Sequence, residues 1–226
     1  MIFDSHAHYD SEQFDIDRDE LLGSVLPQKG VVAVINMAAD YESLKKTVAL
    51  CEKYDYIYGA VGIHPECAND LPDNWLSDVE ALLSHPKKHD LPVVIHDREA
   101  HGDMMDILRK YKPKGVVHCF SGSAELAQET VKLGMYIGLG GVVTFKNARH
   151  SVEVAKTIPL DRLLTETDAP YMAPVPFRGK RCDSSMIPYD AAKIAEVRGI
   201  TAQEVLETAC ENACRLFGIT LPSAAK

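Results

Sequence analysis

The chain has 226 residues, of which 46% are hydrophobic and 25% are charged, a composition typical of a globular protein with a sizeable core. Its formal net charge of −9 argues against binding nucleic acid by general basic attraction, although bound cations would still allow local contact with phosphates. No run is long and apolar enough to span a bilayer, and charge begins at Asp4, so we expect a cytoplasmic protein without a signal peptide.

Short β-branched runs alternate with helical patterns along the chain. The expected strands span residues 2–8, 31–37, 57–63, 91–96, 115–119, 135–145 and 163–167. The expected helices span residues 18–26, 41–53, 74–84, 99–111, 123–133 and 147–157, with two more inside 188–217. This alternation favours a parallel sheet covered on both faces. Because no Gly-rich phosphate loop follows the first strand, we expect a TIM (β/α)₈ barrel that forms a single domain over residues 1–226.

The first strand ends in His6-Ala-His8. Side chains on a strand alternate between its two faces, so His6 and His8 should share a face with Asp4. Phe3 and Ala7 should lie on the other face, against packed helices. Two imidazoles at this spacing can bind one divalent metal ion. A pair of ordinary surface histidines is the alternative, and the apolar opposite face argues against it.

Further polar residues fall at strand ends, where TIM barrels carry their catalytic groups. His64, His96 and His118 each close an expected strand, and Asp168 follows the seventh. One such histidine would most simply be a hydrogen-bonded core residue, but five on one rim with an aspartate indicate a metal centre. Such ligands suit zinc, manganese or magnesium, and two ions would activate water for hydrolysis.

Several motifs, taken in chain order, resemble those of one family. They are His6-Ala-His8, Gly62-Ile-His-Pro65, Leu91-Pro-Val-Val-Ile-His96, His118-Cys-Phe-Ser-Gly122, Glu166-Thr-Asp-Ala-Pro-Tyr171, Arg178-Gly-Lys-Arg181 and Asn212-Ala-Cys-Arg-Leu-Phe-Gly218. Together they resemble the TatD family of metal-dependent deoxyribonucleases. The resemblance implies an amidohydrolase-type barrel that hydrolyses DNA phosphodiester bonds, often as a 3′-to-5′ exonuclease on single strands.

The resemblance also implies a set of metal ligands. It makes His6, His8 and Asp168 ligands of one divalent ion. It makes His96 and His118 ligands of a second. Asp168 would in addition accept a proton from the attacking water, as in related barrels.

Substrate contacts are implied in the same way. His64 would contact the scissile phosphate or its neighbour. Glu166 would support the ligands or the substrate, and a solvated rim carboxylate is its alternative. A small basic cluster is expected to contact the DNA backbone, with an ordinary solvated loop as its alternative: Arg178, Lys180 and Arg181.

Two features depart from the family pattern. The loop after Arg181 reads Cys182-Asp-Ser184, where the family usually has Asn-Glu-Pro. The family also has a strand reading approximately Gly-Glu-Ile-Gly-Leu-Asp before the one that ends at His96, and its glutamate bridges both metal ions. Nothing here matches that strand, and the seven expected strands are one short of a TIM barrel. We therefore expect one βα unit, containing the fourth strand, to be missing between Lys87 and His89.

Two explanations account for the missing unit. We expect that it is omitted from this sequence and present in the complete molecule, because deleting it would leave two strand edges unpaired. A natural or engineered deletion is the alternative. A Cα–Cα distance far from ~3.8 Å near residues 87–89 would support omission, and an intact peptide there would contradict it.

The leading hypothesis is a monomeric, divalent-metal-dependent DNase that acts on single-stranded DNA without an organic cofactor or a membrane partner. Two alternatives stay open. One is a hydrolase of a small amide, lactone or phosphoester, because related barrels use the same ligands. The other is a metal-binding protein that is inactive without the bridging glutamate.

Overall fold

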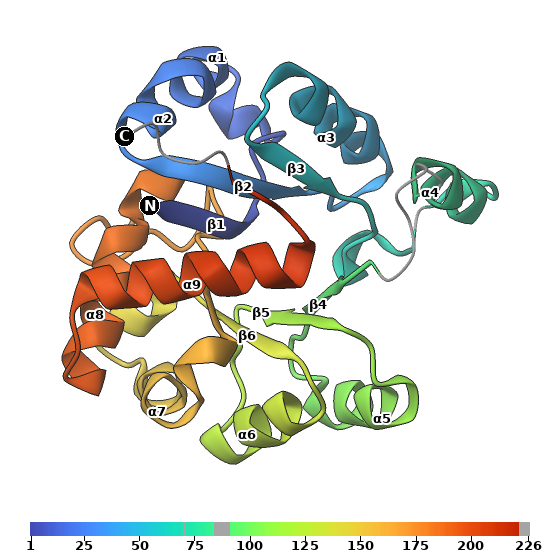
Figure 1. Cartoon of the computed structure of the whole chain (residues 1–226). Coiled ribbons are helices and arrows are strands. Elements are labelled where there is room, and N and C mark those ends of the chain that lie inside the picture. Colours follow the sequence, from blue (N-terminus) through green and yellow to red (C-terminus); the bar gives the residue numbers. More distant parts are fainter. Residues whose placement is uncertain (70, 84–90, 222–226) are drawn as a thin grey trace.

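The computed structural model describes residues 1–69, 71–83 and 91–221, and these form two parallel sheets. The first sheet contains β1 (Ile2–Ala7), β2 (Val31–Met37) and β3 (Ile57–Ala60). The second contains β4 (Val93–His96), β5 (Gly115–His118), β6 (Tyr136–Leu139) and β7 (Leu163–Thr165). A bridge between Ala7 and Ala169 joins β1 to the segment after β7. The strands therefore follow the wall of the predicted barrel, with an interruption between β3 and β4 (Figure 1).

The helices lie outside the strands (Figure 1). They are α1 (Arg18–Glu20) and α2 (Leu26–Gln28), joined by a π turn, then α3 (Tyr41–Lys53), α4 (Trp75–Leu83), α5 (His101–Tyr111), α6 (Ala124–Lys132), α7 (Arg149–Thr157), α8 (Ile187–Arg198) and α9 (Ala202–Phe217). Among the described residues, no helix combines the length and apolar character that crossing a lipid bilayer requires.

Helix α9 closes the end of the barrel opposite the expected site. Its Leu216 lies in one apolar cluster with Phe3 and Leu164 from the strands, and the ring of Phe217 stacks on Phe3. The Asn212 amide donates to the carbonyl of Leu163 at the start of β7. These contacts fall at the amino ends of the strands, so the carboxyl ends are left for a site.

Strand β6 is shorter than the predicted strand over residues 135–145. The chain leaves it at Gly140 and forms a 3₁₀ turn over Gly141–Thr144. A Cβ atom at Gly141 would lie 1.8 Å from the carbonyl oxygen of Met172, so only glycine allows this close approach of two backbones. The apolar run therefore continues as a buried turn under the loop that follows β7.

The predicted alternation along β1 is only partly right. His6 and His8 both face the site, but the register of β1 against β2 is irregular between Asp4 and Ala7. Phe3 lies in the cluster with α9 inside the barrel, not on the outward face with Ala7. A register irregularity changes which side chains share a face of the strand, and the alternation of residues in the sequence does not reveal such an irregularity.

The seven described strands agree with the expected count, and the interruption falls where the missing unit was expected. Residues 84–90 lie outside the described residues. The predicted break near residues 87–89 therefore lies outside them too.

Candidate metal centre and active site

Asp168 is brought beside the first strand by backbone hydrogen bonds. Its N–H donates to the carbonyl of His6 at 2.9 Å, and the N–H of His8 donates to Ala169 at 2.7 Å. Asp168 has φ 63°, a left-handed conformation that aspartate tolerates better than most residues. The carboxylate is thereby fixed at the rim next to both histidines.

Three atoms of this group form a nearly equilateral triangle. The Nε2 atoms of His6 and His8 are 3.2 Å apart, and they lie 3.6 and 3.4 Å from Oδ1 of Asp168. The point equidistant from all three is therefore about 2 Å from each, the distance at which divalent metals bind imidazole and carboxylate. The His8 Nδ1–H donates to the carbonyl of Met37 at 2.9 Å, so Nε2 is the unprotonated nitrogen of this ring and has the lone pair that a metal ion would use. The triangle fits a divalent cation.

Burial keeps His6 uncharged. It lowers the pKa of His6 well below the usual value, and the neighbouring His118 and His8 lower it further. The rings of His6 and His118 stack with centroids 3.4 Å apart, an arrangement that two cationic rings would not adopt. The Nδ1 atom of His6 is buried without a hydrogen-bond partner. A neutral imidazole is the form that binds metal.

Glu166 fixes the orientation of His118. It is 1% exposed, and its Oε1 accepts the His118 Nδ1–H at 3.0 Å and the Cys119 N–H at 2.6 Å. The Nε2 lone pair of His118 then points towards Oδ1 of Asp168, 3.9 Å away. A Cβ atom at Gly138 would lie 2.3 Å from Glu166 Oε2, so this glycine makes room for the carboxylate. Glu166 is thus buried against His118 and is not a solvated rim carboxylate.

The charge on Glu166 also raises the pKa of His118. Burial by itself would lower the pKa of His118, but the adjacent Glu166 carboxylate outweighs it and raises the pKa above the usual value. A raised pKa means a more basic Nε2 and hence a stronger ligand. His118 lies at the end of β5, so the site draws on strands far apart in the chain.

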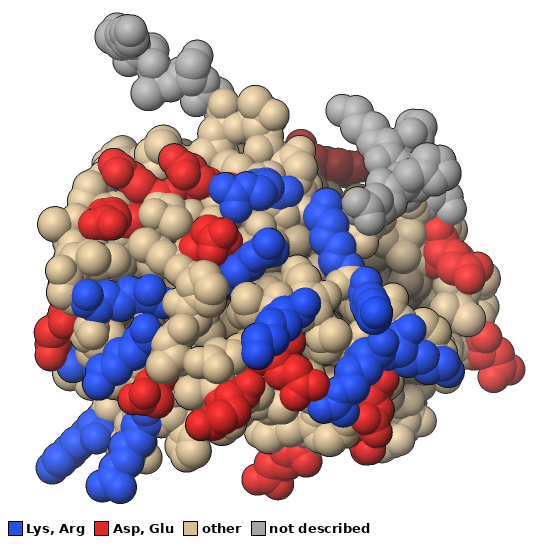
Figure 2. Space-filling view, turned by 60° about the horizontal axis from the view of Figure 1, so that its bottom comes forward, with Lys and Arg blue, Asp and Glu red and all other residues tan. Residues whose placement is uncertain are grey.

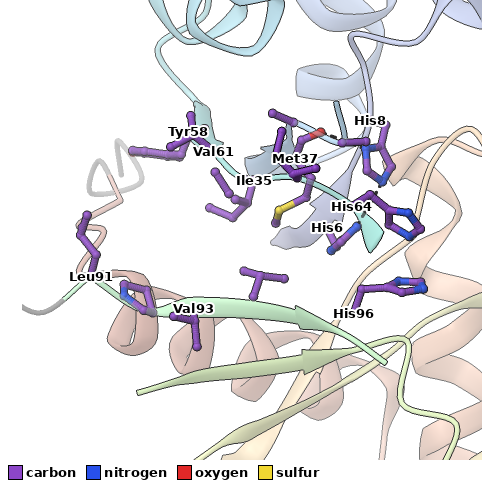
Figure 3. A pocket seen from close by; sticks show the side chains of 18 of the residues that line it. His6, His8, Ile35, Met37, Tyr58, Val61, His64, Leu91, Val93 and His96 are labelled. Atoms are coloured by element: carbon purple, nitrogen blue, oxygen red, sulfur yellow. Dashed lines mark hydrogen bonds between the residues drawn. The ribbon is translucent and has the colours of Figure 1, made fainter. Parts of the chain in front are cut away.

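His64 and His96 meet on the other side of the rim, with ring centroids 4.3 Å apart. Burial lowers the pKa of His96 to about 4, and its Nε2 is buried without a partner. The Nδ1 of His64 accepts the Glu66 N–H at 3.2 Å, which leaves its proton on Nε2 as a donor. Figure 3 shows these two residues with His6 and His8 at one end of a cavity of about 720 Å³.

The predicted basic cluster does not act as one unit. Arg181 donates to both carboxylate oxygens of Asp17, at 2.7 and 2.5 Å, and to the carbonyl of Gln13 at 2.8 Å. These bonds hold Arg181 to the segment around Asp17, and its expected contact with DNA would have to share or replace them. The Arg178 guanidinium lies over the ring of Phe145, at 3.6 Å from its centroid, and Lys180 is exposed. For Arg178 and Lys180 a DNA contact stays a prediction.

Two groups at the rim escaped the sequence analysis. Arg98, two residues after His96, pairs with Glu66 in the turn after His64. A basic residue two positions after a strand-end histidine could have been predicted from the sequence to lie at the rim of the site. Tyr171 and Met172, in the loop after Asp168, are 53 and 41% exposed; Tyr171 was named from the sequence only as the end of a motif, and neither residue was given a role.

Asp4 ties the first strand to the loops behind the site. Its Oδ1 accepts the N–H groups of His6 and Thr167, and its Oδ2 accepts the hydroxyls of Thr167 and Ser184. Burial raises the pKa of Asp4 to about 6, and these four hydrogen bonds oppose the rise. Both oxygens of Asp4 thus accept hydrogen bonds, and the side chain connects the first strand to the loops that carry Thr167 and Ser184.

Asp4→Ala should destabilise the fold by about 2–4 kcal/mol, because it leaves two buried backbone N–H groups and two hydroxyls without their acceptor. Urea unfolding followed by circular dichroism measures the change. Asp161→Ala, at an exposed position, is the matched control and should change stability by less than about 0.5 kcal/mol. Equal stability of the two variants would show that the Asp4 network contributes nothing.

A parallel α/β fold whose strand ends bring two imidazoles and a carboxylate together, with a third imidazole beside them, is the architecture of a metal-dependent hydrolase. Comparison with known proteins gives the particular family. The sequence profile of the TatD related DNase family matches residues 3–88 and 79–218, so the chain belongs to that family. The predicted family, fold and class of enzyme are thereby confirmed.

Individual relatives match over nearly their whole length. The uncharacterized metal-dependent hydrolase YabD of Bacillus subtilis is 36% identical, over 97% of this chain and 100% of the relative. The 3′-5′ ssDNA/RNA exonuclease TatD of Cronobacter sakazakii is 29% identical, over 96% of this chain and 97% of its own. The crystal structure of YjjV, a TatD homologue from Escherichia coli, superposes with a TM-score of 0.83 at 28% identity, over 97% of this chain and 98% of YjjV.

Proposed function

We propose that this chain is a divalent-metal-dependent deoxyribonuclease that shortens single-stranded DNA from the 3′ end. The observation that carries the proposal is the triangle of His6, His8 and Asp168, which fits a divalent ion within the TatD family barrel. The name of the Cronobacter relative, a 3′-5′ ssDNA/RNA exonuclease, supports the substrate and the polarity. Because the site draws on β1, β5 and the segment after β7, we also propose that residues 1–226 act as one domain.

Two divalent ions, magnesium, manganese or zinc, are proposed for the site. His6, His8 and Asp168 would hold the first ion. His96 and His118 would hold the second, together with the nearby Asp168. Such ions supply polarisation of phosphate oxygens and activation of water. Since the described residues place no bridging glutamate between His96 and His118, we expect the second ion to bind more weakly than the first.

The remaining groups of the rim suit a phosphodiester. The Oδ2 of Asp168 would take the proton of the attacking water, and His64 would donate its Nε2–H to a phosphate oxygen. Arg98 would exchange Glu66 for a phosphate. The exposed ring of Tyr171 offers a surface on which a base can stack, as single-strand binding proteins do.

Contact with DNA is expected to be local to the rim. The face in Figure 2 carries Lys and Arg side chains interspersed with Asp and Glu. Together with the net charge of −9, this favours phosphate contact at the metal centre over general attraction. Binding should therefore depend on metal more than on bulk ionic strength.

The test is degradation of a single-stranded oligonucleotide labelled at its 5′ or its 3′ end. With magnesium or manganese, the 5′-labelled strand should shorten stepwise while the 3′ label is released first as mononucleotide. EDTA should abolish shortening, and excess metal should restore it. Metal-dependent cleavage of small phosphoesters or lactones without cleavage of DNA would instead favour the small-molecule hydrolase. Metal binding without turnover would favour the inactive protein.

A further inference from the structure

Backbone hydrogen bonds hold the loop that follows β7 beside the metal centre. The loop spans residues 169–182 and begins directly after Asp168. The Tyr171 N–H donates to the carbonyl of Asp168 at 2.8 Å. The Cys182 N–H donates to the carbonyl of Pro170 at 3.0 Å and so ties the two ends of the loop together. Both ends of the loop are therefore tethered at the rim, next to the candidate ligand.

The loop concentrates positive charge in an acidic chain. It contains Arg178, Lys180 and Arg181 and no Asp or Glu, whereas the whole chain has 33 acidic and 24 basic residues. Arg181 is paired with Asp17. Within the part of the chain that the structure describes, the side chains of Arg178 and Lys180 are exposed and take part in no hydrogen bond or ion pair. The loop therefore carries two cations that are open to an anionic ligand.

The Arg178 guanidinium is positioned by the turn that follows β6. It lies over the ring of Phe145, with Cζ at 3.6 Å from the ring centroid, as in a cation–π contact. A hydrogen bond of 2.9 Å from the Val175 N–H to the Thr144 hydroxyl fixes the turn to the loop. A stacked guanidinium keeps its N–H groups at the edge, where arginine binds a phosphate with two parallel hydrogen bonds. Lys146, the next residue after Phe145, is exposed and adds a further cation.

Exposed apolar side chains lie on the same loop, between Asp168 and Arg178. Tyr171, Met172 and Val175 are 53, 41 and 46% exposed. Met172 has φ 56°, a strained left-handed conformation of the kind that is kept where a site requires it. Aromatic and apolar surface next to cations is what proteins offer to the bases and phosphates of a single strand. The loop thus has the chemistry to hold more of a strand than the bond being cut.

We propose that this loop and Phe145 form a second phosphate subsite, in which Arg178 binds a phosphate of the DNA strand other than the one being cut. The inference rests on the proposed function, because it takes the metal centre as the place of cleavage. The edge of the guanidinium binds the phosphate, the Phe145 ring positions the guanidinium, and Lys180 adds charge. The subsite therefore selects a strand with at least two phosphates over an ester that has only one.

The first test is binding of a fluorescent single-stranded oligonucleotide whose phosphorothioate linkages resist hydrolysis, measured by anisotropy in manganese. Arg178→Ala should weaken binding at least tenfold. It should also lower the slope of log affinity against log salt concentration by about 0.7, the contribution of one phosphate contact on a single strand. Arg178→Lys keeps the charge but loses the planar fork, so it should keep the slope of the parent and lose less affinity.

Arg162→Ala is the matched control. This arginine also lies over an aromatic ring, with Cζ at 5.1 Å from the centroid of Tyr136, but it precedes β7 and so lies at the amino end of the strand, away from the rim. The variant should bind the oligonucleotide with the affinity and the salt slope of the parent. The melting temperature of each variant shows that it is folded.

The second test separates the subsite from the metal centre by comparing two substrates. Bis(p-nitrophenyl) phosphate has one phosphate, and a single-stranded oligonucleotide has many. The ratio of kcat/KM for the oligonucleotide to kcat/KM for the small ester should fall at least tenfold in Arg178→Ala. Phe145→Leu should lower the ratio less, and it should cause no further loss in the Arg178→Ala background, because the ring acts only through the guanidinium.

Three results would overturn the proposal. The first is binding by folded Arg178→Ala with the affinity and salt slope of the parent, which would make Arg178 an ordinary surface stack on Phe145. The second is an equal loss of affinity in Arg162→Ala. The third is absence of oligonucleotide binding by the folded parent. A parent that binds the strand through Arg178 without cutting it contradicts only the proposed function, and a parent that cuts DNA as well without Arg178 contradicts only the subsite.

Discussion

Asp168→Asn should lower the rate of oligonucleotide hydrolysis by about a thousandfold or more. The amide keeps the size of the side chain and tolerates the left-handed φ of 63°, so the fold should be retained. The change removes the negative charge that faces the Nε2 atoms of His6 and His8, and with it the proposed proton acceptor. Single-turnover degradation at saturating manganese measures the loss.

A second substitution in the site and one control substitution test the specificity of this result. His6→Ala removes another corner of the triangle and should be equally inactive while it remains folded. Asp55→Asn, at an exposed position between α3 and β3, should retain full activity. Activity of Asp168→Asn within tenfold of the parent would contradict the assigned site. Circular dichroism and the melting temperature exclude a trivial loss of fold.

Glu166→Ala should weaken manganese binding by about 10- to 100-fold, because the His118 Nδ1–H and the Cys119 N–H lose their common acceptor. The released imidazole can then rotate away from the site or present the wrong tautomer. Calorimetric titration of the metal-free protein with Mn²⁺ measures the change. An affinity equal to that of the parent would show that Glu166 does not position His118.

Glu166→Gln separates the hydrogen bond from the charge. Its amide oxygen can still accept both N–H groups, so the orientation of His118 should survive and the loss of affinity should be the smaller one. The pKa of His118 is raised by the charge on Glu166, so in metal-free Glu166→Gln it should fall. NMR titration of the imidazole reads this directly. An unchanged pKa would mean that the carboxylate is not the cause.

The order of elements could be predicted from the sequence because each depends on local patterning. Apolar runs determine where the strands lie, and residues close in sequence determine where the helices begin. At the start of α9, for example, the side chain of Thr201 accepts the Glu204 N–H at 3.1 Å. Strand ends then mark the rim, since all parallel strands point the same way. That is why His6, His8, His118 and Asp168 could be named before their distances were known.

Tertiary structure alone decided the roles that depend on contacts across the chain. Whether Glu166 faces solvent or His118, and whether Arg181 meets DNA or Asp17, depends on residues more than 40 positions away. The turn at Gly141 and the irregular register of β1 likewise arise from backbone packing that no period in the sequence records. The sequence by itself determined the family and the barrel and indicated the candidate ligands, because these follow from local pattern and motif. The triangle of candidate ligand atoms, the hydrogen bonds that orient the histidines and the opening between β3 and β4 were decided only by folding, because each depends on distances between segments that the chain order leaves free.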